Sequence, residues 1–458
     1  MMMLMPDGVS LRTFVLGGAL SRVSDRTGAG VLHPAPATLV PVYQRQAPGT
    51  TWTTLPPAQD NALVFLLRNA VNTAHATWAG TFASRYRRNR PQPWRRAGAL
   101  AVARALGRLS ASPNGIARLS RLHEAAAARL PDVEWYRDLF RRTRPGLVFC
   151  AKQLSLRTVP PVLAARSLGI PTATFIFSWD NLTAKGHIPA PFDHYLVWSE
   201  HMRLELLHYY PAVPPASVHV VGSPQFDPYA REDLLWSREE FFRRIRADAQ
   251  RPLICYSGGD AGTCPEDPEH VRILLDLVRR GAIRGNPQVV LRPMPVDDTG
   301  RYEAVRREYP ELIVLRPAWV HRGPSWEEVM PLPQDVRLLA NLVHHSTLNI
   351  NVASTMTLDF ALKDRPVVNI AFDVASPPPH GRPLWHHYYQ YDHYRPVVEL
   401  GAARIARSPD ELAEHVNAYL DDPALDREGR RRLTAMQLRG PLGRASERVA
   451  DVLARISA

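Results

Sequence analysis

The sequence predicts an α/β protein with two Rossmann-like domains. Short runs of β-branched and aromatic residues alternate with longer helical patterns, and this alternation is typical of parallel βαβ units. Several runs end directly in glycine, proline or small polar residues, as strands do where they leave a sheet. Two such series occur, and we expect the junction between them near residues 228–237.

The first series begins with a short apolar run and continues to a Gly-Ser-Pro loop. Its predicted elements are strand 146–150, helix 159–168, strand 172–177, strand 193–198, helix 199–209 and strand 218–221. Ligands of parallel sheets bind beyond the carboxyl ends of the strands, so the loops 178–183 and 222–227 are candidate site loops. The loop residues that we expect on an acceptor are Trp179, Asn181, Gly222 and Ser223.

The second series starts with a strand that runs straight into glycines. Its predicted elements are strand 252–256, helix 268–280, strands 288–291 and 311–315, helix 334–342 and strand 367–370. The loop 257–262 follows the first of these strands, and its glycines allow a backbone to approach a ligand closely.

The segment 351–373 is the most informative part of the chain. Ser354, Thr355 and Thr357 stand where a helix should begin, and a helix start offers backbone N–H groups and a positive dipole end to an anion. Asp359 follows one turn later, within reach of a sugar hydroxyl beside a bound phosphate. A capped helix of any α/β protein gives the same pattern, so a nucleotide-diphosphate site is one of two interpretations.

Composition limits the class of protein. The 458 residues suffice for two or three domains, and the three cysteines fit neither a disulfide framework nor a zinc site, which favours a cytoplasmic setting. No apolar run approaches the roughly 18 residues of a membrane-spanning helix, and we expect no signal peptide. The net charge of +12 is carried almost wholly by arginine, but no nucleic-acid-binding signature accompanies it, so we expect no nucleic-acid partner.

Arginine is densest in segment 85–96, which also contains Tyr86 and Trp94. Aromatic and cationic side chains together suit an anionic membrane surface, although a solvated loop is the simpler alternative.

Five motifs in order resemble the glycosyltransferase B (GT-B) superfamily, in which two Rossmann-like domains face across a cleft. They are Ser257-Gly-Gly, Arg292-Pro-Met-Pro, the segment 344–347, the segment 354–359 and Asp364-Arg-Pro. Together with the loops 178–183 and 222–227, they resemble bacterial surface-polysaccharide glycosyltransferases over residues 145–430. The resemblance implies a nucleotide-sugar donor site made by Ser257, Gly258, Gly259, Arg292, His345, Ser354, Thr355, Met356, Thr357 and Asp359.

A transferase that inverts needs a base on the acceptor side. Asp180 is the first candidate, because it follows the strand 172–177 and a carboxylate can take the proton of an acceptor hydroxyl. His187 is the second candidate. Asp180 and Asn181 could instead form a turn that supports the loop.

A metal is not expected at the site. The chain has no Asp-x-Asp pair to bridge a metal and a diphosphate. A histidine cluster, His386, His387 and His393, could bind metal, but its aromatic spacing is more typical of a loop that lines a cleft.

These observations predict a glycosyltransferase that moves a sugar from a nucleotide-sugar to a carbohydrate or lipid-linked acceptor in cell-surface glycan assembly. The expected domains are 1–230 for the acceptor, 231–430 for the donor, and a helical segment 431–458 that returns to the first domain. No cofactor is expected, and the enzyme would work in the cytoplasm or on the inner face of the membrane. The alternatives are a teichoic-acid glycerol- or ribitol-phosphate transferase, against which Met294 counts, a nucleotide-sugar 2-epimerase, and a scaffold without activity.

Overall fold

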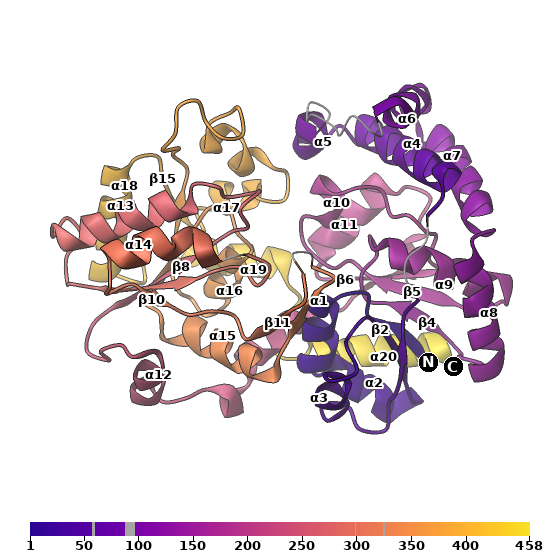
Figure 1. The fold of residues 1–458 in the computed structure, drawn as a ribbon, viewed down its shortest axis with the longest axis horizontal. Coiled ribbons are helices and arrows are strands. Elements are labelled where there is room, and N and C mark those ends of the chain that lie inside the picture. Colours follow the sequence, from indigo (N-terminus) through magenta and orange to yellow (C-terminus); the bar gives the residue numbers. More distant parts are fainter. Residues whose placement is uncertain (57–59, 88–96, 298, 324–325) are drawn as a thin grey trace. The chain divides into compact units, whose positions relative to one another are not determined.

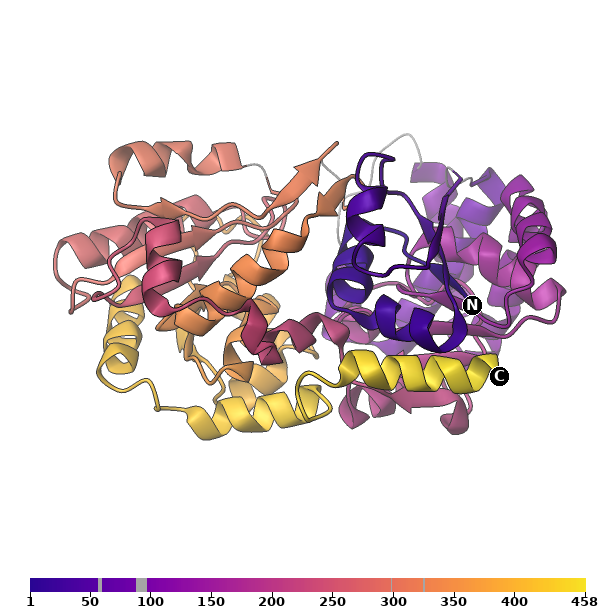
Figure 2. The same ribbon diagram turned by 90° about the horizontal axis from the view of Figure 1, so that it is seen from below.

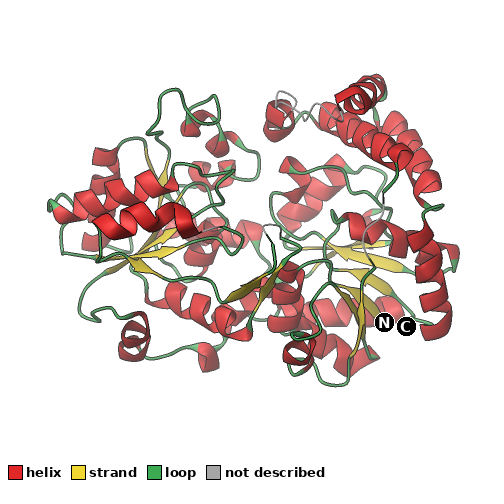
Figure 3. Cartoon of the chain, in the orientation of Figure 1, coloured by secondary structure: helices red, strands yellow, loops and turns green. Residues whose placement is uncertain are grey.

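The computed structural model describes residues 1–56, 60–87, 97–297, 299–323 and 326–458. The chain forms two compact units (Figure 1). Unit 1 comprises Met1–Gln225 and Gln437–Ala458, and unit 2 comprises Phe226–Met436. Both units are α/β, with helices packed around strands (Figure 3).

Unit 1 contains a seven-stranded parallel sheet in the order β3-β2-β1-β4-β5-β6-β7. The strands are β1 (Met2–Leu4), β2 (Gly30–His33), β3 (Thr51–Thr54), β4 (Val148–Cys150), β5 (Thr172–Phe175), β6 (His194–Val197) and β7 (Val218–Val220). The strands β4 to β7 coincide with the four predicted runs. The first three strands were not predicted, and of these β3 is largely solvent-accessible.

Helices surround this sheet, and polar caps start several of them. Ser199 accepts a hydrogen bond from the Met202 amide at the start of α11, as predicted, and Asn61 and Ser112 cap α4 and α7 in the same way. The helices of unit 1 are α1 (Gly8–Ser10), α2 (Ala19–Thr27), α3 (Val40–Gln44), α4 (Ala62–Ala79), α5 (Phe82–Arg87), α6 (Ala97–Leu109), α7 (Pro113–Ala127), α8 (Pro131–Thr143), α9 (Val159–Ser167), α10 (Asn181–Ala184), α11 (Glu200–Tyr209) and α20 (Ala445–Ser457).

The last helix, α20, belongs to unit 1. It packs along α2, as Figure 2 shows, and the Ser446 hydroxyl donates a hydrogen bond to the Gly17 carbonyl. Residues far apart in sequence therefore complete one unit.

Unit 2 contains a six-stranded parallel sheet in the order β10-β9-β8-β13-β14-β15. Its strands are β8 (Leu253–Ser257), β9 (Gln288–Arg292), β10 (Ile313–Val314), β13 (Leu348–Asn351), β14 (Val367–Ile370) and β15 (Arg404–Ala406), and an antiparallel pair is formed by β11 (Trp319–His321) and β12 (Val329–Pro331). The helices are α12 (Arg238–Ile245), α13 (Asp267–Arg279), α14 (Glu303–Glu308), α15 (Pro333–His345), α16 (Met356–Leu362), α17 (Arg395–Glu399), α18 (Pro409–Asp421) and α19 (Arg427–Gln437).

No helix within the described ranges combines the length and the apolarity that are needed to cross a bilayer.

Candidate functional site

The strands β8, β13 and β14 bring the predicted donor segments of unit 2 to one edge of its sheet. Asn351, at the end of β13, lies opposite Ser257 on one side and Asn369 on the other. The glycine loop 257–259 and the loop 352–355 leave adjacent strands in the same direction. Two of the sequence motifs that were assigned to one site, 257–259 and 354–359, are therefore neighbours in the structure.

Beneath this edge lies a chain of buried asparagines that the motif analysis missed. The Asn349 side chain donates to the Ser257 hydroxyl at 2.7 Å, and the Asn351 side chain donates to the side-chain oxygen of Asn349 at 2.7 Å. The Asn369 side chain in turn donates to the side-chain oxygen of Asn351 at 3.0 Å. All three asparagines are fully buried. Buried amides cost free energy unless they are paired, so this network fixes three strand ends relative to one another.

The loop after β13 is held by the same network. The Ser354 amide donates to Asn351 at 2.8 Å, and Ala353 takes a left-handed conformation with φ of 42°. Ser354, Thr355 and Met356 are half-buried, and α16 begins at Met356. Thr357 was predicted to contact a phosphate, but it is fully buried and its hydroxyl forms a hydrogen bond with Tyr394 at 2.9 Å. It also accepts a hydrogen bond from Asn351, so it belongs to the buried network beneath the loop.

The amides of Gly258 and Gly259 in the glycine loop already donate to acceptors within the protein. The Gly258 amide donates to the Arg292 carbonyl at 3.0 Å, and the Gly259 amide donates to the Asp267 carboxylate at 2.7 Å. A β-carbon at Gly258 would lie 2.8 Å from the Tyr302 hydroxyl. The predicted role of this loop is thus corrected: its amides already have partners, and its missing side chains leave room for Tyr302 and Cys264.

Asp267 is the buried anchor of this loop. Its carboxyl accepts from the Tyr256 hydroxyl at 2.7 Å as well as from Gly259, and Arg301 reaches it at 3.4 Å. Arg301 also donates to the Gly259 carbonyl at 2.6 Å. Burial raises the pKa of Asp267 to about 6, and the hydrogen bonds from Tyr256 and Gly259 oppose that rise.

Arg292 does not present its charge to a ligand as predicted. Its guanidinium is buried and pairs with the equally buried Asp335 at 2.6 Å. Asp335 also accepts from the Ala318 amide and the Trp319 indole. This ion pair joins β9 to α15, and the other bonds of Asp335 hold the segment that leads into β11, so its role is structural.

The prediction for His345 was wrong. This residue ends α15 and precedes β13, so it lies at the amino edge of the sheet, whereas Ser354 follows β13 at the carboxyl edge. Its ring contacts the Trp236 carbonyl at 3.0 Å and stacks on Phe241.

Asp359 is buried in α16 and accepts a short hydrogen bond from the Tyr229 hydroxyl. Its predicted contact with a donor sugar or ribose stays a prediction.

The aromatic segment 384–394 contacts the glycine-loop region. Tyr388 donates to the Thr263 carbonyl at 3.0 Å, and His380 contacts the same oxygen at 2.8 Å. His387 stacks on Tyr388, and its ring nitrogen contacts Tyr391. Within the described part of the chain, no group of three or more His, Cys, Asp or Glu side chains is arranged to hold a metal ion.

In unit 1, Asp180 and Asn181 follow β5 at the carboxyl edge, as predicted. The Asp180 carboxylate accepts a hydrogen bond from the side-chain amide of Asn181 at 3.0 Å and pairs with Lys185 at 3.1 Å. Asn181 accepts from Gln153, which follows β4. Trp179 is buried, so it packs the loop rather than facing solvent. The structure holds the Asp180 carboxylate firmly, and its role as a base stays a prediction.

A second polar pair at this edge was missed. Asp7 follows β1 and Lys152 follows β4, and their side chains meet at 2.5 Å. Asp7 is buried and also accepts from the amide and the hydroxyl of Ser10. Asp7 follows β1, which was not predicted, whereas Lys152 follows β4, which was.

Gly222 and Ser223 follow β7 but are packed against α20. A β-carbon at Gly222 would lie 3.1 Å from Ala445, and Arg448 donates to the neighbouring Val221 carbonyl at 2.8 Å. Ser223 is buried. This differs from the predicted acceptor contact, and the pair instead secures the C-terminal helix.

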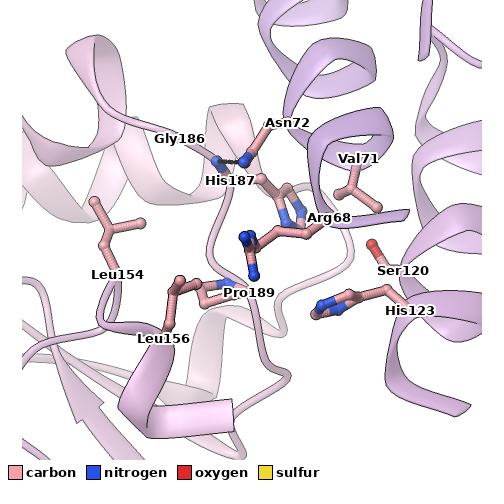
Figure 4. Close-up of a pocket in the computed structure, with 10 residues that line it drawn as sticks. All are labelled: Arg68, Val71, Asn72, Ser120, His123, Leu154, Leu156, Gly186, His187 and Pro189. Atoms are coloured by element: carbon pink, nitrogen blue, oxygen red, sulfur yellow. Dashed lines mark hydrogen bonds between the residues drawn. The ribbon is translucent and has the colours of Figure 1, made fainter. Parts of the chain in front are cut away.

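The second base candidate, His187, lies in the wall of a cavity of about 220 Å³ whose lining does not include Asp180 (Figure 4). His187 packs against His75 and Tyr210 with ring centroids 5.0 Å and 5.3 Å away. Burial, followed by the neighbouring His75 and His123, holds the pKa of His187 well below its usual range. His187 is therefore neutral near pH 7 and separate from the Asp180 loop.

The basic segment 85–96 is described only in its first residues. Arg85 and Tyr86 belong to α5, whereas residues 88–96 lie outside the described residues.

No protein-family model matches this sequence, and none of the curated proteins matches it. Solved structures do match it over 99% of its length. An S. aureus structure described as MnaA with UDP has a TM-score of 0.54, 10% identity and 95% of its own chain covered. A Neisseria meningitidis UDP-GlcNAc 2-epimerase bound to UDP-GlcNAc has a TM-score of 0.52, 11% identity and 100% coverage. A Rickettsia africae glycosyltransferase has a TM-score of 0.51, 9% identity and 97% coverage. Identities this low establish the fold alone, and the chain has the GT-B fold that its sequence motifs resemble.

Proposed function

We propose that this chain is a glycosyltransferase that uses a nucleotide-sugar, with unit 2 binding the donor and unit 1 binding the acceptor. The observation that carries the proposal is the carboxyl edge of unit 2, where the asparagine network holds the glycine loop beside the loop 352–355. Structures of the same fold are described with UDP and with UDP-GlcNAc. A UDP-sugar is therefore the first donor to test.

In this reaction an acceptor hydroxyl attacks the anomeric carbon of the sugar. The bond from that carbon to the diphosphate oxygen breaks, and the nucleoside diphosphate leaves with the electron pair. Asp180, which pairs with Lys185 at 3.1 Å, would accept the acceptor's proton. Thr355, half-buried at the start of α16, would contact the diphosphate. The main catalytic effects would be orientation and stabilisation of the leaving group.

A nucleotide-sugar 2-epimerase is the second candidate, because several structures that match this fold carry that name. The two reactions differ in their need for an acceptor. An epimerase converts its nucleotide-sugar to the C2 epimer alone, whereas a transferase releases free nucleoside diphosphate in step with product. Incubating the protein with UDP-GlcNAc and following the sugar by NMR distinguishes them. Formation of the C2 epimer without an acceptor would replace the first proposal by the second.

We further propose a place for the enzyme at the inner face of a membrane, where cell-surface glycans are assembled on lipid-linked acceptors. The support is the arginine-rich composition of the segment that includes α5 and α6. Near an anionic surface each cation contributes about 1 kcal/mol of attraction.

A further inference from the structure

Unit 1 contains a second and larger cavity beside the one that His187 lines. Its volume is about 620 Å³, and one wall is α7 while the other is formed by the segments 187–192 and 209–214. We call it the apolar groove. Its wall is rich in proline and aromatic side chains, and the aromatic side chains are Trp78, Phe192, Tyr195, Tyr209 and Tyr210. A pocket of this size and lining is typical of a site for an apolar small molecule.

The two histidines in the groove, His75 and His187, are uncharged near neutral pH, because burial lowers the pKa of each. Glu124 and Arg121 are the charged residue types of the lining, and Arg121 lies on the exposed side of α7. A wall with so few charged groups favours a hydrocarbon occupant, because little charge must lose its water when the chain enters.

The groove adjoins a polar end. The 220 Å³ cavity shares Ser120, His187 and Pro189 with it, so the two cavities have part of their wall in common. Arg68 extends from α4 into the middle of this polar end (Figure 4). Its guanidinium pairs with Asp60 at 2.7 Å, and Ser120 contributes a buried hydroxyl that has no hydrogen-bond partner among the described residues. An arginine beside an unpaired hydroxyl suits a phosphate group.

The helices around the groove have a surface suited to anionic lipid. The helices α4, α6 and α7 contain five arginines, no lysine and one acidic residue. Four large apolar side chains on α4, α6 and α7 are more than half exposed, namely Leu63, Val102, Leu109 and Leu122. Exposed apolar groups among cations are the features of a helix that lies in a membrane interface.

We propose that the apolar groove binds the hydrocarbon chain of a phosphate-bearing lipid acceptor, with the phosphate at the polar end beside Arg68. This inference rests on the proposed function and names its acceptor class: a long alkyl or isoprenoid chain that ends in phosphate. The occupant follows from the size of the groove, its aromatic and proline-rich wall, the arginine at its end and the cationic, apolar surface of its helices.

The test measures binding by calorimetry with butyl, dodecyl and farnesyl phosphate below their micelle concentrations. Each methylene that leaves water contributes roughly fourfold in affinity. We therefore expect at least one of the long-chain phosphates to bind at least 100-fold more tightly than butyl phosphate, with a negative heat-capacity change. The dodecyl and farnesyl arms distinguish an alkyl from an isoprenoid chain. Equal affinity of all three phosphates would overturn the inference.

A filling variant checks the location. Ala117→Trp places a large ring on the α7 wall and should weaken long-chain binding at least tenfold. Ala125→Trp on the same helix is the matched control, because Ala125 is also exposed but does not line the groove, and it should bind like the wild type. Ala212→Trp tests the opposite wall in case the first variant is unstable. Equal effects of the groove and control variants would refute the assignment.

Stabilisation by UDP is measured on the same samples. If UDP stabilises the protein but chain length has no effect, the groove inference fails and the proposed function stands. If chain length matters but no nucleoside diphosphate binds, the groove holds a lipid and the transferase proposal fails.

Discussion

Replacing Asn351 by leucine should destabilise unit 2 strongly, although the two side chains have similar size. Asn351 accepts from the Ser354 amide and from Asn369, and it donates to Asn349 and Thr357. Water can reach the half-buried Ser354, and Thr357 keeps its bond to Tyr394. The side-chain oxygen of Asn349 and the side-chain N–H of Asn369 are fully buried, and each would lose the hydrogen bond that it makes with Asn351. At about 1–3 kcal/mol for each such group, the expected loss of unfolding free energy is about 2–6 kcal/mol.

Hydrogen exchange detected by mass spectrometry suits this measurement. It reports the opening free energy of peptides in β8, β13 and β14, and it does not require two-state unfolding of a chain with two units. Tyr394→Phe removes a single hydroxyl that donates to Asn369, so it should cost about 1–3 kcal/mol.

Asn417→Leu is the matched control. Asn417, on α18, also makes two side-chain hydrogen bonds, to the Arg284 amide and the Ala282 carbonyl, but it is only partly buried. Water can replace those partners, and the expected loss is about 1 kcal/mol. A loss below about 1 kcal/mol for Asn351→Leu, or one equal to that of the control, would refute the view that the asparagine network fixes the site loops.

Three further predictions concern catalysis, pH and membrane binding. Asp180→Asn should lower turnover by roughly 10²–10⁴ with donor affinity nearly unchanged, and turnover within a few-fold of the wild type would remove Asp180 as the base. Because the pKa of Asp267 is raised from 3.8 to about 6, the unfolded chain releases this proton first as pH rises. The free energy of unfolding should therefore fall between about pH 4 and pH 6 and then level off, and a slope of equal size in Asp267→Asn would contradict that origin. Co-sedimentation should show binding to anionic but not neutral vesicles at low salt, reduced when Arg87, Arg88, Arg95 and Arg96 become serine; equal binding to both lipids would favour a solvated loop.

The sequence predicted the parts of the fold in which strand and helix patterns are strong. Buried, β-branched runs identified β5, β6, β8, β9 and β14, and Ser199 marked the start of α11 correctly. The strands β1 to β3 were not predicted, although they are no shorter than β4 to β7, which were. Their position in the sheet depends on pairing with β4, which only the tertiary structure supplies.

The segments of the candidate site were identified from the sequence, but their hydrogen-bond pairing was not. The order of the motifs placed Ser257 and Ser354 together correctly. Sequence could not show that Arg292 is neutralised by Asp335, which is 43 residues away, or that His345 lies at the other edge of the sheet. The signal that could have revealed the polar network was available: Asn349, Asn351 and Asn369 interrupt two otherwise apolar strands, and buried amides in such strands require partners.

Nucleotide binding by unit 2 is the central claim, and calorimetry with UDP in the presence of EDTA tests it most directly. At about 100 times its dissociation constant, UDP should raise the free energy of unfolding by about 2.7 kcal/mol. GDP, CDP and dTDP serve as comparisons, and Asn351→Leu should weaken the effect while Asn417→Leu preserves it. If none of the four nucleoside diphosphates binds or stabilises the protein, the donor site at the ends of β8 and β13 is contradicted.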